Sequence, residues 1–271
     1  MGGVHLYSVC WNEAEMLGFF FRHYDPWVDR YVIFDDGSDD GTIEILSAHP
    51  KVEVREFPRH DDSFVHAHTQ LNNTAWQESR GSADWVVLAD IDEFFHHPQQ
   101  PMAGYLAQQR SLGVNIIPGI GFGMVADSMP PDAGQLVDVV RRGRPRAPFN
   151  KLGIFDPAAV QETRVKHGRH VAEPTGDLRL PARDEVMLMH YKHLGFERWC
   201  ERDDDLGARR GSRDLAERLG RHYEQSRSER EEFWATLVAE SREVGGAGFE
   251  ADQLAADPRW WKGLPRVRAQ G

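Results

Sequence analysis

The stretch that decides the fold is D-W-V-V-L-A-D-I-D-E-F-F, residues 84–95. An apolar run leads into two aspartates, Asp90 and Asp92, which are followed by Glu93 and two phenylalanines. Isolated charge in an apolar core is costly unless it is paired or coordinates a metal ion. The segment therefore predicts a buried strand over Asp84–Asp90 whose end carries acidic side chains that some partner must neutralise.

The first hundred residues alternate between segments with strand character and segments with helix character. Strands are expected at Val4–Cys10, Asp29–Asp36, Val52–Phe57 and Asp84–Asp90, and helices at Glu13–Tyr24, Thr42–Ala48 and His66–Arg80. Strands that alternate with helices form βαβ units, which gives a largely parallel sheet with helices on both faces. The predicted fold class is α/β, with a mostly parallel, Rossmann-like sheet.

Beyond about Pro98 the pattern becomes irregular, because prolines and glycines break it into loops and short strands. Arg141–Arg146 (R-R-G-R-P-R) is expected to be a mobile surface loop, with contact to a phosphate as the alternative. Residues 203–244 are charged and helix-prone. Since no internal repeat and no linker is visible, we expect one domain over residues 1–271, with a regular half (1–97) and a more irregular half (98–271).

Composition narrows the classes of function. The apolar fraction of 40% suits a folded protein, and the net charge of −11 argues against nucleic-acid binding. An anionic ligand must then be met by local cations or by a metal ion. The two cysteines are expected to be free thiols, and no apolar run is long enough to span a membrane. With no secretion signal at its N-terminus, the chain is expected to be cytoplasmic.

Acidic residues follow two of the predicted strands, at the edge where α/β sheets bind ligands. Asp35 and Asp36 end the second strand, and Asp90 and Asp92 end the fourth. In a strand the latter two would face the same way, about 6.5 Å apart. Carboxylate oxygens favour Mg²⁺ or Mn²⁺. The alternative is that these acids cap a following helix, and the second acidic strand end favours the metal site.

Three segments carry a resemblance to a known family: residues 11–17 (W-N-E-A-E-M-L), 32–42 (V-I-F-D-D-G-S-D-D-G-T) and 88–95 (L-A-D-I-D-E-F-F). In this order and spacing they resemble a GT-A glycosyltransferase of the family 2-like group, with the D-I-D-E-F variant of the family 92-like branch. The resemblance covers residues 4–97 well and the rest more thinly. It implies that residues 1–97 bind a nucleotide-sugar donor and residues 98–271 bind the acceptor.

The resemblance also implies roles for single residues of the first half. In the family, the acid of the D-D-G-S turn contacts the nucleoside. Carried over to this chain, the nucleoside contacts are Asp35 and Asp36, with Asn12 and Glu13 beside them.

The second acid pair is assigned to a metal ion by the same resemblance. Asp90 would face the ribose or the metal, and Asp92 would be the main metal ligand. Such enzymes often complete the metal shell with a histidine from a later strand, which selects His190 in the segment 185–192 (E-V-M-L-M-H-Y-K). Imidazole suits Mn²⁺ better than Mg²⁺, so Mn²⁺ is the expected cofactor and Mg²⁺ the alternative.

The implied activity is metal-dependent transfer of a hexosyl or N-acetylhexosaminyl group from a nucleoside diphosphate, with UDP the expected one, to a hydroxyl of a small molecule or glycan. Lys151 and Lys192 are candidates to neutralise the leaving diphosphate, with two surface lysines as the alternative. Inversion at the anomeric carbon needs a general base. The candidates are Asp127, Glu173, His167 and His170, and Asp127 is selected because it follows a glycine-rich apolar stretch.

Two other enzyme classes fit less well. A haloacid-dehalogenase-type phosphatase needs a second acid two residues after the first, and Gly37 stands there after Asp35. A sugar nucleotidyltransferase usually has a basic, glycine-rich loop after its first strand, where this chain has the acidic C-W-N-E-A-E. Near the end of the chain, Trp260 and Trp261 are expected to dock the tail, with stacking on an acceptor sugar as the alternative.

Overall fold

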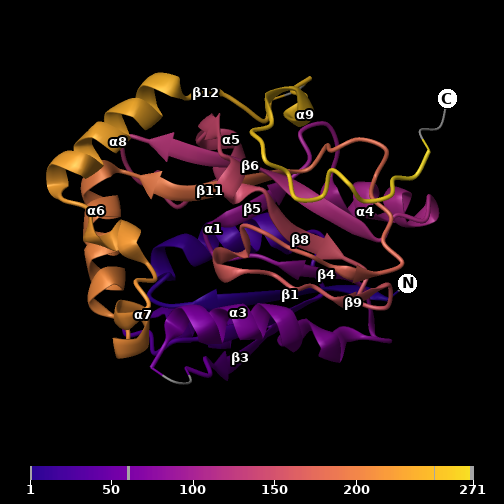
Figure 1. The fold of residues 1–271 in the computed structure, drawn as a ribbon, viewed down its shortest axis with the longest axis horizontal. Helices are drawn as coiled ribbons and strands as arrows, with labels where there is room; N and C mark the ends of the chain where they lie inside the picture. The colour runs from indigo at the N-terminus through magenta and orange to yellow at the C-terminus, as the bar shows by residue number, and fades with distance from the viewer. Residues whose placement is uncertain (1, 60–61, 247, 269–271) are drawn as a thin grey trace.

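The computed structural model describes residues 2–59, 62–246 and 248–268, and its centre is one large sheet (Figure 1). Within those ranges the sheet has ten strands: β1 (Gly3–Cys10), β2 (Arg30–Asp35), β3 (Val52–Glu56), β4 (Ala83–Leu88), β5 (Glu93–His96), β6 (Ile116–Ala126), β7 (Arg142–Pro145), β8 (Lys151–Phe155), β11 (Met187–Leu194) and β12 (Arg242–Glu243). Their order is β12-β7-β6-β8-β4-β1-β2-β3, and β11 pairs with β5 and β6 off this path.

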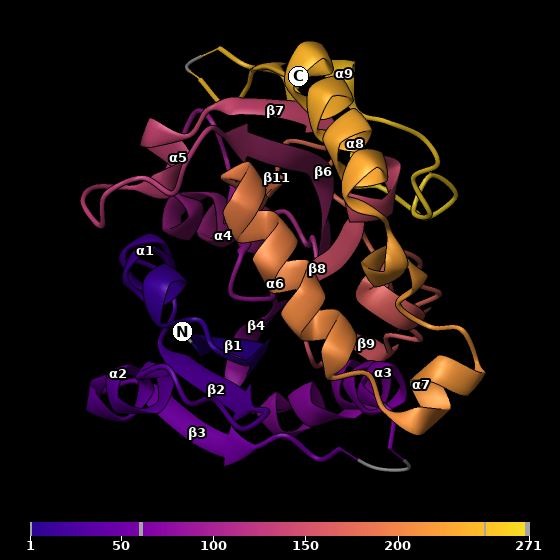
Figure 2. The same cartoon turned by 90° about the vertical axis from the view of Figure 1, so that its left-hand side faces the viewer.

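The first four strands are parallel, as their alternation with helices predicted. β1 pairs with both β2 and β4, and β2 pairs with β3. The connecting segments are α1 (Ala14–Tyr24), α2 (Thr42–Ala48), α3 (Phe64–Thr74) and the 3₁₀ helix η1 (Ala75–Ser79). Helices α1 and α2 lie on one side of these strands and α3 on the other (Figure 2). The predicted α/β class is confirmed.

Beyond β4 the sheet becomes mixed. β8 is antiparallel to β4 and to the first part of β6, whereas the rest of β6 runs parallel to β11. β5 is antiparallel to β11, which brings the segment after β4 beside a strand about 95 residues later in the chain. Two short strands, β9 (Val160–Glu162) and β10 (Thr175–Gly176), form a separate antiparallel pair.

The glycines of β6 let other segments lie directly against the sheet. A Cβ on Gly121 would collide with the backbone of Phe149, and a Cβ on Gly119 would collide with the ring of Phe95. The 3₁₀ helix η2 (Ala147–Phe149) can therefore pack flat on β6, since glycine in a strand permits such a close approach.

The stretch Arg141–Arg146 is not the mobile loop that its composition suggested. Four of its residues form β7, which is antiparallel to β6 on one side and to β12 on the other. Pro145 stands at the end of β7, where its missing N–H does not interrupt the ladder. The hydrogen bonds to β6 thus override the turn-forming character of the residues.

The remaining helices follow the second half of the sheet. They are α4 (Met102–Ser111), α5 (Leu136–Val139), η3 (His167–Arg169), α6 (Phe196–Ala208), α7 (Ser212–Ala216), η4 (Arg221–Glu224), α8 (Arg227–Glu240) and α9 (Ala251–Leu254). A capping box of Ser226 and Glu229 starts α8. Helix α6 crosses the edge of the sheet at which β1, β2 and β4 end (Figure 2).

The two tryptophans near the end of the chain dock the tail onto the domain, as predicted. Trp261 is buried and its indole N–H donates to Asp184 Oδ2 at 2.9 Å. The indole N–H of Trp260 donates to the carbonyl of Asn150 at 3.2 Å. Their polar atoms are thus engaged within the chain, and the alternative of stacking on a sugar is not needed to explain them.

Two further expectations concern the whole chain. Over the ranges that the structure describes, no helix combines the length and the apolar character that crossing a membrane requires. Cys10 and Cys200 are both buried and unpaired, as expected for free thiols.

Candidate active site

The two aspartates of the D-I-D segment lie in the turn between β4 and β5. The strand ends at Leu88, two residues earlier than predicted, and the turn is closed by a hydrogen bond from the Glu93 N–H to the Asp90 carbonyl at 3.0 Å. Ile91 is buried and only 2% exposed, whereas Asp90 and Asp92 keep part of their surface accessible. The acids therefore reach the carboxyl edge of the sheet, although from a turn rather than from a strand.

Asp92 and His190 meet across this edge. The pairing of β5 with β11 places His190 opposite Glu93, and His190 Nε2 lies 3.0 Å from Asp92 Oδ2. The backbone N–H of Tyr191 donates to the Asp92 carbonyl at 2.8 Å, which holds the turn against β11. Burial raises the pKa of Asp92, but the charge and the hydrogen bond of His190 outweigh it and leave the pKa below its ordinary value.

Glu93 is the centre of a buried charge network. Its carboxylate is fully buried and forms ion pairs with Lys151 and Arg169, which are themselves only 3% and 1% exposed. Arg169 also donates to the Leu88 carbonyl at 2.5 Å, the last residue of β4. Burial raises the pKa of Glu93, and the two cations bring it below its ordinary value. This buried network holds the turn between β4 and β5 in place.

Asp90 shares the same cations. Its carboxylate lies 3.1 Å from Arg169, 3.4 Å from His68 and 3.9 Å from Lys151. Burial raises its pKa, and these neighbours, Arg169 first, bring the pKa well below the ordinary value. Asp90 is therefore an ionised carboxylate whose charge is already largely balanced by protein cations.

The donor set fits a divalent ion in part. In the described portion of the chain, no group of three His, Cys, Asp or Glu side chains could hold a metal ion. Asp92 and His190, however, present an oxygen and a nitrogen 3.0 Å apart. That spacing equals about √2 times a metal–ligand distance of ~2.1 Å, the separation of neighbouring ligands in an octahedral shell. Two protein ligands would leave the other positions for phosphate oxygens and water.

The turn after β2 is shaped by its own side chains. Asp35 accepts hydrogen bonds from the N–H groups of Gly37 and Ser38, both at 2.9 Å. Asn12, two residues after β1, donates to Asp39 at 2.7 Å and accepts from the Asp39 N–H. The residues expected at the nucleoside thus lie together. The carboxylate of Asp35, however, is already hydrogen-bonded within the turn.

Asp36 is held by two arginines from distant parts of the sequence. Arg59 pairs with it, and Arg209, just past α6, lies 3.0 Å from its carboxylate. The Arg209 guanidinium also stacks 4.0 Å from the ring centroid of Trp11. Arg202 of α6 donates to the Trp11 carbonyl at 2.6 Å. Helix α6 therefore brings cations to the side chains that were expected at the nucleoside.

Glu13 pairs with Arg202 at 2.5 Å. Burial is the largest influence on Glu13 and raises its pKa to about 7, against the opposing effect of Arg202. The folded chain then holds this proton to higher pH than the unfolded chain does.

Because the pKa of Glu13 is raised in the folded chain, we expect the stability of the fold to depend on pH. Between about pH 4.5 and 7 the folded state binds more protons, so the free energy of unfolding falls as the pH rises. Glu13→Gln removes this linkage. Between pH 4.5 and 8 we expect the free energy of unfolding of the variant to rise by about 1–3 kcal/mol relative to that of the wild type. Urea unfolding of both proteins at several pH values measures the difference. Parallel stability profiles would contradict the raised pKa.

Three further candidates from the sequence are Lys192, Asp127 and Glu173. Lys192 forms an ion pair with the buried Asp203 at 2.9 Å, and its ammonium lies 5.4 Å from the ring centroid of Tyr223 in η4. Asp127 is exposed, directly after β6. Glu173 is 60% exposed and lies 3.7 Å from Lys166.

Among the four candidate bases, His170 directly follows Arg169 of the charge network, and the charges of Lys151 and Glu93 act on it. Its Nδ1 hydrogen-bonds to the carbonyl of Pro148, which can only accept, so Nδ1 carries the proton and Nε2 is free to accept one. Desolvation, and then the charge of Lys151, lower the pKa of His170 to about 4, although part of the ring remains exposed. The imidazole is therefore neutral at pH 7. His167, the first residue of η3, packs its ring on His66 instead.

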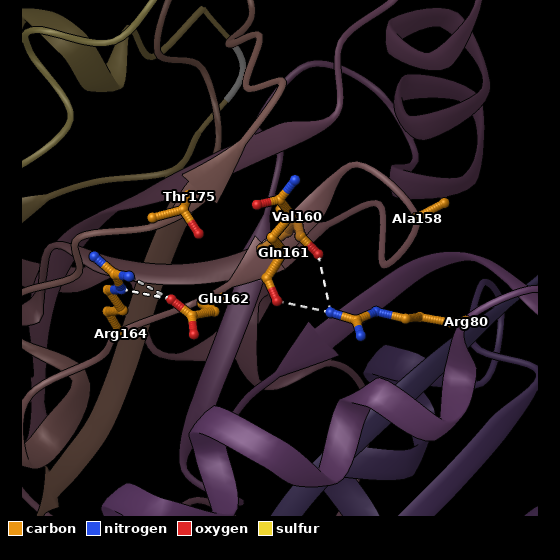
Figure 3. Close-up of a pocket in the computed structure, with 7 residues that line it drawn as sticks. All are labelled: Arg80, Ala158, Val160, Gln161, Glu162, Arg164 and Thr175. Carbon is orange, nitrogen blue, oxygen red and sulfur yellow. Dashed lines mark hydrogen bonds and ion pairs between the residues drawn. The ribbon is translucent and has the colours of Figure 1, made fainter.

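A shallow hollow on the surface lies elsewhere (Figure 3). Its lining is Arg80, Ala158, Val160, Gln161, Glu162, Arg164 and Thr175. Arg80 precedes the start of β4, whereas Asp90 follows its end, so the hollow is at the opposite edge of the sheet. Its arginines are engaged, Arg80 by the Gln161 carbonyl at 2.7 Å and Arg164 by Glu162 (Figure 3).

Sequence reasoning missed three contributors to the site: Arg169, His68 and the arginines of the α6 region. Arg169 lies in an irregular segment among other charged residues, and nothing local marks it as buried. The sequence did indicate that such partners exist, because three buried acids in a net acidic chain require cations beside them. The sequence does not reveal which of its arginines supply them.

Comparison with known proteins supports the glycosyltransferase resemblance. No model of a known protein family matches the chain. A glycosyltransferase family 92 protein from Ricinus communis is 28% identical over 94 residues, covering 34% of this chain and 16% of the relative. Another, from Arabidopsis thaliana, is 30% identical over 111 residues, covering 38% and 18%. The chain thus matches less than a fifth of the length of these relatives. Both are named as family 92 proteins and not as family 2 proteins.

Solved structures match parts of the chain, at low identity and low TM-score. A glucosyl-3-phosphoglycerate synthase from Mycobacterium tuberculosis, in complex with Mn²⁺, UDP and phosphoglyceric acid, is 17% identical, covers 45% of this chain and 43% of its own, and gives a TM-score of 0.29. A 4-diphosphocytidyl-2C-methyl-D-erythritol synthase is 16% identical, covers 58% of this chain and 76% of its own, and gives a TM-score of 0.30.

Proposed function

We propose that this chain is a metal-dependent glycosyltransferase that moves a hexosyl or N-acetylhexosaminyl group from a nucleoside diphosphate to an acceptor hydroxyl, with inversion. The observation that carries the proposal is the Asp92–His190 pair at the carboxyl edge of the sheet. The Asp35–Asp36 turn follows β2 at the same edge of the sheet, in the order of motifs that resembles GT-A enzymes. The partial likeness to family 92 proteins supports the same activity.

Residues 1–97 would bind the donor. The Trp11 ring offers a face for a base, and Asp36 and Asn12 offer polar contacts to the nucleoside. The Arg209 guanidinium covers the Trp11 ring and pairs with Asp36. A nucleotide that enters here would meet a cation of α6 close to its phosphates, which a chain of net charge −11 needs in order to bind an anion.

Asp92 and His190 would hold the divalent ion, Mn²⁺ or Mg²⁺. When bound, it supplies Lewis-acid stabilisation of the diphosphate as that group leaves with extra negative charge. Asp90 lies beside these ligands as an ionised carboxylate whose charge Arg169 balances, and it can orient a donor hydroxyl. Lys192 lies farther along β11 and can add positive charge toward the diphosphate if it exchanges Asp203 for that partner.

His170 is the general base in this proposal, in place of Asp127. Its free Nε2 can take the proton of the acceptor hydroxyl, and the hydrogen bond of Nδ1 to Pro148 keeps the ring in that tautomer. Asp127 is exposed, and among the described residues no polar contact ties it to the network. A base must lie within reach of the proton that it removes, which favours His170.

The experiment that tests this function is calorimetric binding of UDP, GDP and ADP, with and without Mn²⁺. We expect one nucleotide to bind, at least about tenfold more tightly with Mn²⁺. Asp92→Ala should bind that nucleotide equally with and without the ion, because the protein ligand of the metal is gone. Binding of none of the three under either condition would count against a nucleotide-sugar site.

A further inference from the structure

Arg146 is a partly buried cation whose charge is not balanced. Its guanidinium lies 5.6 Å from the ring centroid of Phe149 and 5.3 Å from that of Phe233 in α8. Only its backbone is hydrogen-bonded, with the N–H donating to the Gly121 carbonyl at 2.8 Å. Within the described residues, its guanidinium has neither a hydrogen-bond nor an ion-pair partner.

Other arginines of the described chain make the contrast clear. The nearby Arg144, in β7 and two residues before Arg146, pairs with Glu240 at 2.8 Å. The other described arginines whose side chains lack a polar partner are exposed, where water satisfies them; they are Arg218, Arg221, Arg242 and Arg268. In a chain with 43 acidic and 32 basic residues, an unpaired and partly buried arginine requires an explanation.

The position of Arg146 is fixed by the sheet. Gly121 lacks a Cβ, so the backbone of η2 lies directly on β6. A Cβ on Gly123 would press on the Phe149 ring and touch the Arg146 stem. The two aromatic faces then hold the guanidinium by cation–π contacts without consuming its N–H donors. Burial, and then the charge of Arg144, lower the pKa of Arg146, but a guanidinium remains charged at neutral pH.

Arg146 is one ring away from the candidate metal ligands. Phe149 packs edge-on against His190, with 4.4 Å between their ring centroids, and His190 contacts Asp92. The Phe149 ring therefore lies between the guanidinium and His190, on the side formed by β7, η2 and α8. All of these belong to the half of the chain that is proposed to bind the acceptor.

We propose that Arg146 binds an oxyanion of the acceptor, so that the acceptor is a hydroxyl compound with a carboxylate or phosphate group. A guanidinium with free donors binds such groups in a bidentate manner. The inference rests on the proposed glycosyltransferase function and specifies its acceptor class. An acidic chain would repel an anionic acceptor without such a cation, and a neutral sugar would not need one.

The first test uses inorganic phosphate as the probe, without donor or metal. The Nε–Hε signal of Arg146 is followed by NMR during a phosphate titration, with Arg144 as the control. We expect the Arg146 signal to shift in a saturable way at millimolar phosphate and the Arg144 signal to stay in place. Arg146→Ala should weaken phosphate binding about tenfold, whereas Arg144→Ala should leave it unchanged. An Arg146 signal that phosphate does not move would overturn the proposal.

The second test separates acceptor from donor. In wild type, release of nucleoside diphosphate should be at least about tenfold faster with glucuronate or glucose 6-phosphate than with glucose, and Arg146→Ala should remove the preference. UDP affinity with Mn²⁺ should be the same in both proteins. Loss of UDP affinity in Arg146→Ala would assign the guanidinium to the donor and refute the proposal. The proposal would also be refuted if no anionic compound accelerated the release of nucleoside diphosphate relative to glucose. Absence of any nucleotide binding would instead refute the glycosyltransferase function, while the phosphate titration stands by itself.

Discussion

Asp92→Asn is expected to lower the turnover of sugar transfer by about 10³-fold while the chain remains folded. The substitution removes the carboxylate charge that would hold the ion on the leaving diphosphate, and it keeps the shape of the side chain. The fold should tolerate the change, because the Asp92 side chain contacts His190 and is 26% exposed. Release of nucleoside diphosphate measures the turnover, and thermal unfolding checks the fold.

Asp177→Asn is the matched control for this variant. Asp177 is 76% exposed and lies far along the chain from the turn after β4. It should keep wild-type turnover. Near-normal turnover of Asp92→Asn with unchanged dependence on Mn²⁺ would show that the ion is held elsewhere.

The same assay decides between the proposed bases. His170→Gln should reduce turnover without changing nucleotide affinity, since the base acts on the acceptor rather than on the donor. Asp127→Asn should have little effect. The reverse result would return the role to Asp127, the residue that the sequence had favoured.

The first half of the fold could be predicted because its patterns are local. Strand and helix signals alternate over residues 4–90, and each signal depends on neighbours along the chain. Proximity of His190 to Asp92 was also predictable, but only through the family resemblance. The structure provides its physical cause, which is the antiparallel pairing of β5 with β11.

The rest of the site depends on contacts between residues far apart in sequence. Arg202 and Arg209 reach Glu13 and Asp36 from more than 170 positions away, because α6 crosses the edge of the sheet. No local pattern distinguishes these arginines from the many on the surface. The strand β7 was missed for a related reason, since pairing with β6 overrides the turn-forming residues within it.

Glu93→Gln is expected to lower the free energy of unfolding by about 3–5 kcal/mol. Glutamine keeps the shape of the side chain but removes the charge between Lys151 and Arg169, both nearly fully buried. Two buried cations then share the single carboxylate of Asp90, from which Lys151 is 3.9 Å away. Urea unfolding at neutral pH measures the loss.

Glu162→Gln provides the matched control, because Glu162 and its partner Arg164 are both 54% exposed. Breaking that exposed pair should cost less than about 1 kcal/mol. Adding Lys151→Met to Glu93→Gln should restore part of the lost stability, since one unpaired cation disappears with it. A loss below that of Glu162→Gln would mean that Asp90 alone balances both cations. Glu93 would then be dispensable to the turn that carries Asp92, and the position of Asp92 would depend on β11 alone.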